Sequence, residues 1–158
     1  MSEQKDAHSD DKAMSTQTEY LSFRIGGSEY SVEIMSVREI RGWTRTTSLP
    51  HAPHFVRGVI NLRGTVLPVV DLALRLGLDA SEPEERNVII VVDVGTRVMG
   101  LRVDAVSDIL AFSDDQLQPP PDMTSKSRFV RALTILDDRM VRILDLEAVL
   151  PSNEEIAA

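Results

Sequence analysis

Few residues in this chain have the types and spacing that catalysis or metal binding requires. His51 and His54 lie three positions apart in one proline-rich loop, and two imidazoles at that distance could ligate a metal. No carboxylate lies within four residues of either histidine, and no other histidine follows in the chain. We therefore interpret the pair as residues of a loop surface, with a metal site as the weaker alternative.

Asp71 and Asp145 are the best candidates for a pair of carboxylates that could perform acid–base chemistry. Each aspartate directly precedes a short helical pattern, so both fit the role of structural N-caps, and this interpretation explains the two residues together. The chain has no cysteine, and no serine is accompanied by a histidine and an aspartate that could complete a catalytic triad. The sequence thus predicts no catalytic residue, no metal site and no cofactor.

Composition narrows the fold and the partners of this 158-residue chain. Hydrophobic residues make up 42% and aromatic residues only 4%, which favours strands packed by branched aliphatic side chains. The net charge is −8, of which the two polar ends carry −2 each. An acidic body with seven aromatic residues argues against nucleic acid as a partner, so a small-barrel nucleic-acid binder is a remote alternative.

Hydrophobic runs in the chain are short. The longest uninterrupted aliphatic run, Val88–Val92, is much shorter than a membrane span requires, and residues 1–18 lack the apolar stretch of a signal peptide. We expect a cytoplasmic protein without direct membrane insertion.

The most informative feature is an internal repeat. Residues 21–40 match residues 90–109 at a shift of 69, so that Gly26 falls on Gly95 and Ile40 on Ile109. Residues 55–76 match residues 129–150 at a shift of 74, so that Asp71 falls on Asp145. Two ordered matches of this length indicate a duplicated unit.

Each unit alternates apolar and polar residues in the manner of short strands. The predicted elements of the first unit are a hairpin around Gly26-Gly27, a helical turn over Val37–Ile40, a second hairpin with strands Val59–Leu62 and Thr65–Val70 joined at Arg63-Gly64, and a short helix after Asp71. Short half-buried strands must hide their edges, so each unit predicts a small barrel.

The expected organisation is all-β with a few short helices. Two small barrels related by duplication pack around a shared core, and pattern alone leaves open whether the first strand crosses to the other barrel. The expected boundaries are a disordered tail at 1–18, a first lobe at about 19–78, a connector at 79–86, a second lobe at about 87–150 and a polar C-terminal tail at 151–158.

The two copies differ most at their second hairpins. Pro68 of the first copy corresponds to Arg142, and the basic tip at Arg63 corresponds to the acidic tip Asp137-Asp138. Duplicated scaffolds often diverge where they meet partners, so this hairpin is a candidate docking element, with ordinary drift as the alternative.

The residues from Gly58 to Leu72 resemble the signature of the CheW family, the coupling proteins of bacterial chemotaxis. The quoted residues are Gly58-Val59-Ile60-Asn61-Leu62-Arg63-Gly64, then Pro68-Val69 and Asp71-Leu72, and the resemblance extends over roughly residues 19–150. It implies two SH3-like β-barrels without catalytic activity, monomeric alone and assembled in receptor arrays. The implied partners are the regulatory domain of the histidine kinase CheA and the cytoplasmic tip of a chemoreceptor. A coupler of a related twitching or other non-flagellar pathway is the alternative.

The resemblance also implies which residues bind partners. Arg63 and Glu39 match positions tied to receptor and kinase coupling and are expected to form an ion pair. The implied partner-binding set is Val37, Glu39, Ile40, Gly58, Val59, Asn61, Leu62, Arg63 and Gly64, with Ile60 helping to shape the hairpin.

Overall fold

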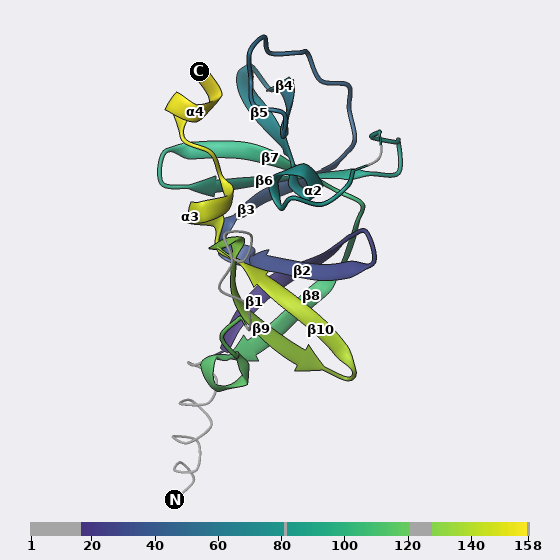
Figure 1. Cartoon of the computed structure of the whole chain (residues 1–158), viewed down its shortest axis with the longest axis vertical. Coiled ribbons are helices and arrows are strands. Elements are labelled where there is room, and N and C mark those ends of the chain that lie inside the picture. The colour runs from purple at the N-terminus through teal and green to yellow at the C-terminus, as the bar shows by residue number, and fades with distance from the viewer. Residues whose placement is uncertain (1–16, 81, 121–127, 158) are drawn as a thin grey trace, which may run out of the picture.

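The chain forms two five-stranded β-sheets with a few short helices between and beside them, which confirms the all-β class. A computed structural model describes residues 17–80, 82–120 and 128–157. Figure 1 shows the two sheets one above the other along the long axis of the molecule. Within the described part of the chain, no helix is both long and apolar enough to cross a bilayer.

The first sheet joins the start of the chain to its second half. Its strand order is β8-β1-β2-β10-β9, and every neighbouring pair is antiparallel except β2 and β10. The strands are β1 (Gln17–Ile25), β2 (Ser28–Glu33), β8 (Ala105–Ser113), β9 (Val130–Leu136) and β10 (Arg139–Leu144).

The second sheet has the matching order β3-β6-β7-β5-β4, with β5 and β7 as its parallel pair. Its strands are β3 (Val37–Gly42), β4 (Val56–Leu62), β5 (Thr65–Asp71), β6 (Val88–Val94) and β7 (Arg97–Val103). The helical elements are η1 (Ile34–Ser36), α2 (Leu72–Arg75), η2 (Asp114–Gln116), α3 (Leu146–Val149) and α4 (Asn153–Ala157).

Each repeat gives its first hairpin to the sheet of the other repeat. The β1–β2 hairpin of the first repeat joins β8, β9 and β10 of the second, and the β6–β7 hairpin of the second joins β3, β4 and β5 of the first. The expected division into lobes at 19–78 and 87–150 therefore does not describe the sheets. The reason is the crossing of the chain after β2 and after β7, which alternating hydrophobicity does not encode.

The duplication is visible in the details of the backbone. The turn glycines Gly26 and Gly95 share a φ of 62°. Each sheet curls into a barrel that is closed by one isolated bridge, Thr47 to Val59 in one sheet and Gln118 to Leu133 in the other. We call the barrel of the β3–β7 sheet barrel 1 and the barrel of the β1–β10 sheet barrel 2.

Three apolar clusters hold the fold together. The largest lies between the sheets and includes Phe23, Tyr30, Val70, Leu101 and Val149, so it is the shared core that the sequence predicts. Barrel 1 encloses Ile60, Leu62, Leu67, Val69, Ile89 and Val91. Barrel 2 encloses Tyr20, Leu110, Phe112, Ala132, Val141 and Ile143. Burial of these aliphatic and aromatic side chains is the main stabilising contribution.

Arg75 lies where the two repeats meet. Its guanidinium carbon is 4.3 Å from the centre of the Phe55 ring and 5.1 Å from that of the equivalent Phe129 ring. Its Nε donates a hydrogen bond of 2.8 Å to the carbonyl oxygen of Val149. The cation thereby joins α2 to the end of α3 and stacks on both repeats.

Two local predictions are wrong. Val37–Ile40 lies in strand β3 instead of a helical turn, because its backbone pairs with β6, and tertiary pairing overrides the i, i+3 spacing. Gln17 and Thr18 belong to β1, while residues 1–16 of the expected disordered tail lie outside the described part of the chain. The C-terminal tail contains helix α4, whose Ile156 packs against the shared core.

Candidate functional site

The site begins with a tight turn between β4 and β5. Arg63 and Gly64 both have positive φ, 52° and 89°, which is the geometry of a two-residue hairpin turn. The backbone N–H of Gly64 donates to Oδ1 of Asn61 at 2.8 Å, so the Asn61 side chain holds the turn closed. The sequence therefore places Arg63 at an exposed tip, as predicted.

Arg63 reaches across barrel 1 to the opposite edge of its sheet. One of its terminal guanidinium nitrogens donates to Oε1 of Glu39 on β3, which confirms the expected ion pair. Arg41 approaches the other oxygen of Glu39 at 3.3 Å. Hydrogen bonding from Arg63 is the main cause that lowers the pKa of Glu39, so this carboxylate stays charged at neutral pH.

A groove of about 350 Å³ opens beside this ion pair at the mouth of barrel 1. The charged side chains of Arg38, Glu39 and Arg63 line it together with apolar residues. The apolar lining comprises Leu62, Leu67, Val91 and Val98. We call this the barrel 1 groove; its apolar lining with charged residues at the rim resembles the composition of protein–protein interfaces.

Gly58 sits at a bulge in β4, where the register to β5 shifts. Its φ is +139°, and a Cβ at this position would overlap the carbonyl oxygen of Thr47. The same threonine pairs with Val59 through two backbone hydrogen bonds of 2.9 and 2.8 Å, which close barrel 1. Gly58 is therefore required for barrel closure, and Val59 takes part in it through its backbone.

The remaining predicted site residues divide between surface and interior. Ile60 and Leu62 are buried inside barrel 1 and support the hairpin from inside, and Leu62 also lines the groove. Val37 is half-buried and packs against the shared core, whereas Ile40 is 48% exposed. The structure thus places Glu39, Ile40 and Arg63 on the outside of barrel 1.

Ile109 and Met35 are among the exposed apolar residues that lie outside the set named from the sequence. Ile109 on edge strand β8 is the repeat equivalent of Ile40 and is 58% exposed, and Met35 in η1 is 88% exposed. The repeat alignment already paired Ile40 with Ile109, so that match was the signal for Ile109. No sequence signal separated Met35 from Met99, which is buried.

The mouth of barrel 2 has charged residues in place of two residues that line the barrel 1 groove. Glu29 corresponds to Val98, and Arg139 corresponds to Thr65. Glu29 on β2 accepts a hydrogen bond from Nε of Arg139 at 3.0 Å, and it also accepts from the hydroxyl of Ser22. Arg139 further contacts Asp108, the repeat equivalent of Glu39, at 3.2 Å. Hydrogen bonding from Arg139 lowers the pKa of Glu29. The two barrel mouths therefore present different chemistry to a partner.

Asp71 does not cap helix α2 with its side chain, so the capping prediction is wrong for this residue. Its carboxylate is fully buried and accepts from Nε of Arg57 at 2.7 Å and from Arg102 at 3.1 Å. Arg102 continues to Asn87, whose Oδ1 it contacts at 2.8 Å. The two guanidinium groups hold the carboxylate away from the helix terminus.

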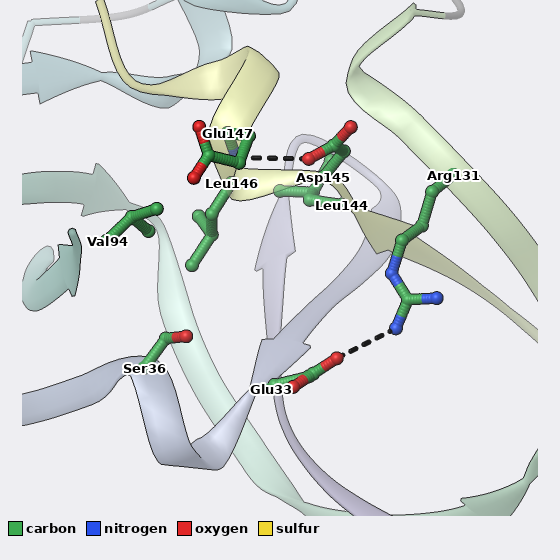
Figure 2. A pocket seen from close by; sticks show the side chains of 8 residues that line it. All are labelled: Glu33, Ser36, Val94, Arg131, Leu144, Asp145, Leu146 and Glu147. Carbon is green, nitrogen blue, oxygen red and sulfur yellow. Dashed lines mark hydrogen bonds and ion pairs between the residues drawn. The ribbon is translucent and has the colours of Figure 1, made fainter.

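Asp145 does cap its helix, as predicted. Its Oδ1 accepts from the backbone N–H of Glu147 at 3.0 Å, and Figure 2 shows this bond at the start of α3. In the same view Arg131 points away from Asp145 and pairs with Glu33 at 3.1 Å. A small cavity of about 170 Å³ lies among these side chains.

In the described part of the chain, no three His, Cys, Asp or Glu side chains form a cluster that could hold a metal ion. The ring of His54 packs edge-on against Phe55 with centroids 5.6 Å apart.

Comparison with known proteins places this geometry in a family. The family model for the CheW-like domain matches residues 19–154. The chain is 54% identical over 142 residues to "Chemotaxis protein CheW" of Rhizobium meliloti, covering 89% of this chain and 92% of that protein. It is 37% identical over 138 residues to the protein of the same name from Klebsiella aerogenes, covering 86% and 83%. The solved structure of the scaffolding protein TtCheW from Thermoanaerobacter tengcongensis is similar with a TM-score of 0.79 and 31% identity, covering 86% of this chain and 94% of that one.

Proposed function

Since the chain belongs to the CheW-like domain family, we propose that it is a chemotaxis adaptor that couples the cytoplasmic tips of chemoreceptors to the histidine kinase CheA. The protein is proposed to act by docking, without catalysis, and to work in the cytoplasm, where its partners recruit it to membrane receptor arrays. The family match and the likeness to a scaffolding protein support this proposal.

The structural observation that carries the proposal is the exposed surface around the Glu39–Arg63 ion pair. Edge strand β3 and the β4–β5 tip meet there beside the barrel 1 groove. Ile40 adds exposed apolar area on the same strand. An apolar centre with a charged rim is typical of protein–protein interfaces, and the arginine can exchange Glu39 for an acid of the partner.

The set proposed to bind partners comprises the surface residues and the residues that shape them. Glu39, Ile40, Asn61 and Arg63 lie at the surface or on its rim, and Gly58 and Gly64 fix the backbone of the hairpin. Val37, Val59 and Leu62 support the same surface from the half-buried or buried side.

A reconstitution experiment tests the function. Purified chain is mixed with CheA and with receptor fragments in vesicles, and kinase autophosphorylation is measured with wild-type chain, with Arg63→Ala and with Arg86→Ala. We expect Arg63→Ala to remain folded, because Arg63 is an exposed turn residue, and to lose receptor-dependent kinase activation. Arg86→Ala is the matched control, since Arg86 is an exposed arginine that pairs with nearby Glu84 in the connector.

Two outcomes would contradict the proposal. Wild-type chain that fails to bind either CheA or receptor fragments in a pull-down would refute the adaptor function. Full activation by Arg63→Ala would leave the adaptor function intact but refute the assignment of the site.

A further inference from the structure

Each of the two sheets is completed by a hairpin from the other repeat, so each sheet must bind the correct hairpin of the two. Both sheets have the same strand order, and the parallel pairing of β2 with β10 matches that of β7 with β5. Backbone hydrogen bonds alone would therefore let either hairpin complete either sheet. Side-chain contacts must determine which hairpin completes which sheet.

Glu29 and Arg139 form a contact that differs between the two sheets, in which the carboxylate is buried and the arginine is part-exposed. Glu29 lies on the β1–β2 hairpin of the first repeat and is 5% exposed. Arg139 lies on β10 of the second repeat and donates to both oxygens of Glu29 through Nε and a terminal nitrogen. The pair thus links a first-repeat hairpin to a second-repeat strand.

The equivalent positions of the other sheet carry no charge. Glu29 corresponds to Val98 of the β6–β7 hairpin, and Arg139 corresponds to Thr65 of β5. If each hairpin completed its own repeat, Glu29 would face Thr65 and lose its cation, while Arg139 would face Val98. A buried carboxylate without a counterion is strongly unfavourable, so pairing of a hairpin with the sheet of its own repeat is energetically disfavoured.

A second, exposed pair favours the same arrangement weakly. Arg38 of the first repeat contacts Asp93 of the second at 3.1 Å. The repeat equivalent of Asp93 is Arg24, so pairing within the first repeat would bring two arginines together. Both side chains are substantially exposed, and solvent screens this contribution.

The other ion pairs between the repeats do not discriminate. Asp71–Arg102 and Glu33–Arg131 also join the two repeats. However, Asp71 is matched by Asp145, and Arg57 by Arg131, so either hairpin would meet the same charges in either sheet. This leaves Glu29–Arg139 as the ion pair with a buried carboxylate that distinguishes the two sheets.

We propose that the Glu29–Arg139 pair determines the specificity of the interface between the repeats, so that each repeat recognises the unlike repeat and rejects a copy of itself. The partner of the first repeat's hairpin is a second-repeat sheet, in the same chain or in a second copy. An ion pair with a buried carboxylate in this role sets which halves assemble, beyond any contribution to stability.

The test uses the full chain with a protease site inserted between Asp79 and Ala80 of the connector. The folded protein is cleaved, unfolded in urea and refolded, and native mass spectrometry counts the pairs of halves. We expect unlike pairs to exceed like pairs by at least about tenfold in the wild type. In E29V/R139T, which carries the residues of the other sheet, like pairs should rise toward about half of all pairs, the statistical share.

The matched control is E33Q/R131Q, which removes a pair between the repeats that does not discriminate and should leave the distribution as in the wild type. Like pairs at the statistical share in the wild type would overturn the proposal, as would strictly unlike pairing in E29V/R139T. If cleaved halves do not refold, a urea double-mutant cycle on the uncut chain with E29Q and R139Q replaces the count. Coupling of at least about tenfold in the folding equilibrium supports the pair, and coupling below about twofold overturns it.

Discussion

Asp71 and Asp145 occupy equivalent positions in the two repeats, yet their carboxylates bind different partners. The backbone N–H of each donates to the carbonyl of the equivalent phenylalanine, at 2.7 Å for Asp71 to Phe55 and 2.8 Å for Asp145 to Phe129. The Asp145 side chain caps α3, whereas the Asp71 side chain binds two arginines.

The cause is a single difference on the exchanged hairpins. Arg102 of β7 faces Asp71 in the parallel ladder, while its repeat equivalent on β2 is Glu33. Glu33 forms an ion pair with Arg131, so the Asp145 carboxylate accepts from the helix backbone instead. The two equivalent aspartates are therefore expected to contribute different amounts to the free energy of unfolding.

Replacing Asp71 and Asp145 separately by alanine measures this difference. Asp71→Ala removes the buried carboxylate that pairs with buried Arg102, so we expect a loss of about 3–5 kcal/mol in the free energy of unfolding. Asp145→Ala removes a helix cap and should cost about 1 kcal/mol. Urea unfolding of both variants checks the values, and equal losses would contradict this explanation.

Gly58→Ala should destabilise barrel 1, because the new Cβ would meet the Thr47 carbonyl at a φ that alanine rarely adopts. We expect a loss of about 2 kcal/mol or more in the free energy of unfolding. Gly42→Ala is the control, since a Cβ there has no atom within 4 Å. A loss no larger than that of the control, measured by thermal unfolding, would show that the bulge accepts a side chain.

Stability should fall in acid partly through Glu29. Arg139 lowers the pKa of the folded carboxylate below the usual 4.5, so its contribution is complete above that value and is lost as the pH falls through the folded pKa. Glu29→Gln cannot titrate at this position. We expect the free energy of unfolding to decline less steeply below about pH 4.5 in Glu29→Gln than in the wild type; identical slopes in urea titrations would argue against the shift.

Ile40→Ser and Ile109→Ser test the exposed apolar residues of the edge strands. Both side chains are about half exposed, so stability should change by no more than about 0.5 kcal/mol. Binding to receptor fragments or to CheA should weaken by about 1 kcal/mol or more for each residue that lies in an interface core. Leu78→Ser serves as the control, because Leu78 is also exposed, at 40%, and lies beyond α2, outside the strands of the proposed binding surface. Isothermal titration would reject the assignment of a residue whose variant binds like the control.

Local pattern was sufficient for the hairpins and for the tip that presents Arg63. Alternating residues around Gly26-Gly27 and Arg63-Gly64 specify two-residue turns, and the observed strands begin and end close to those expected. Turn chemistry acts within a few residues, so the sequence contains it directly. Val37–Ile40 was misread because its strand conformation depends on β6, about fifty residues away.

The sequence by itself determined that the chain is a duplicated, strand-rich unit whose exposed tip carries Arg63, because alternation, turn residues and repeats are properties of neighbouring positions. Only the tertiary structure decided that the hairpins are exchanged between sheets, that Asp71 binds Arg57 and Arg102, and that Glu29 lies buried against Arg139. Those relationships join residues up to 110 positions apart, and ion pairing depends on which side chains the crossing chain brings together in space.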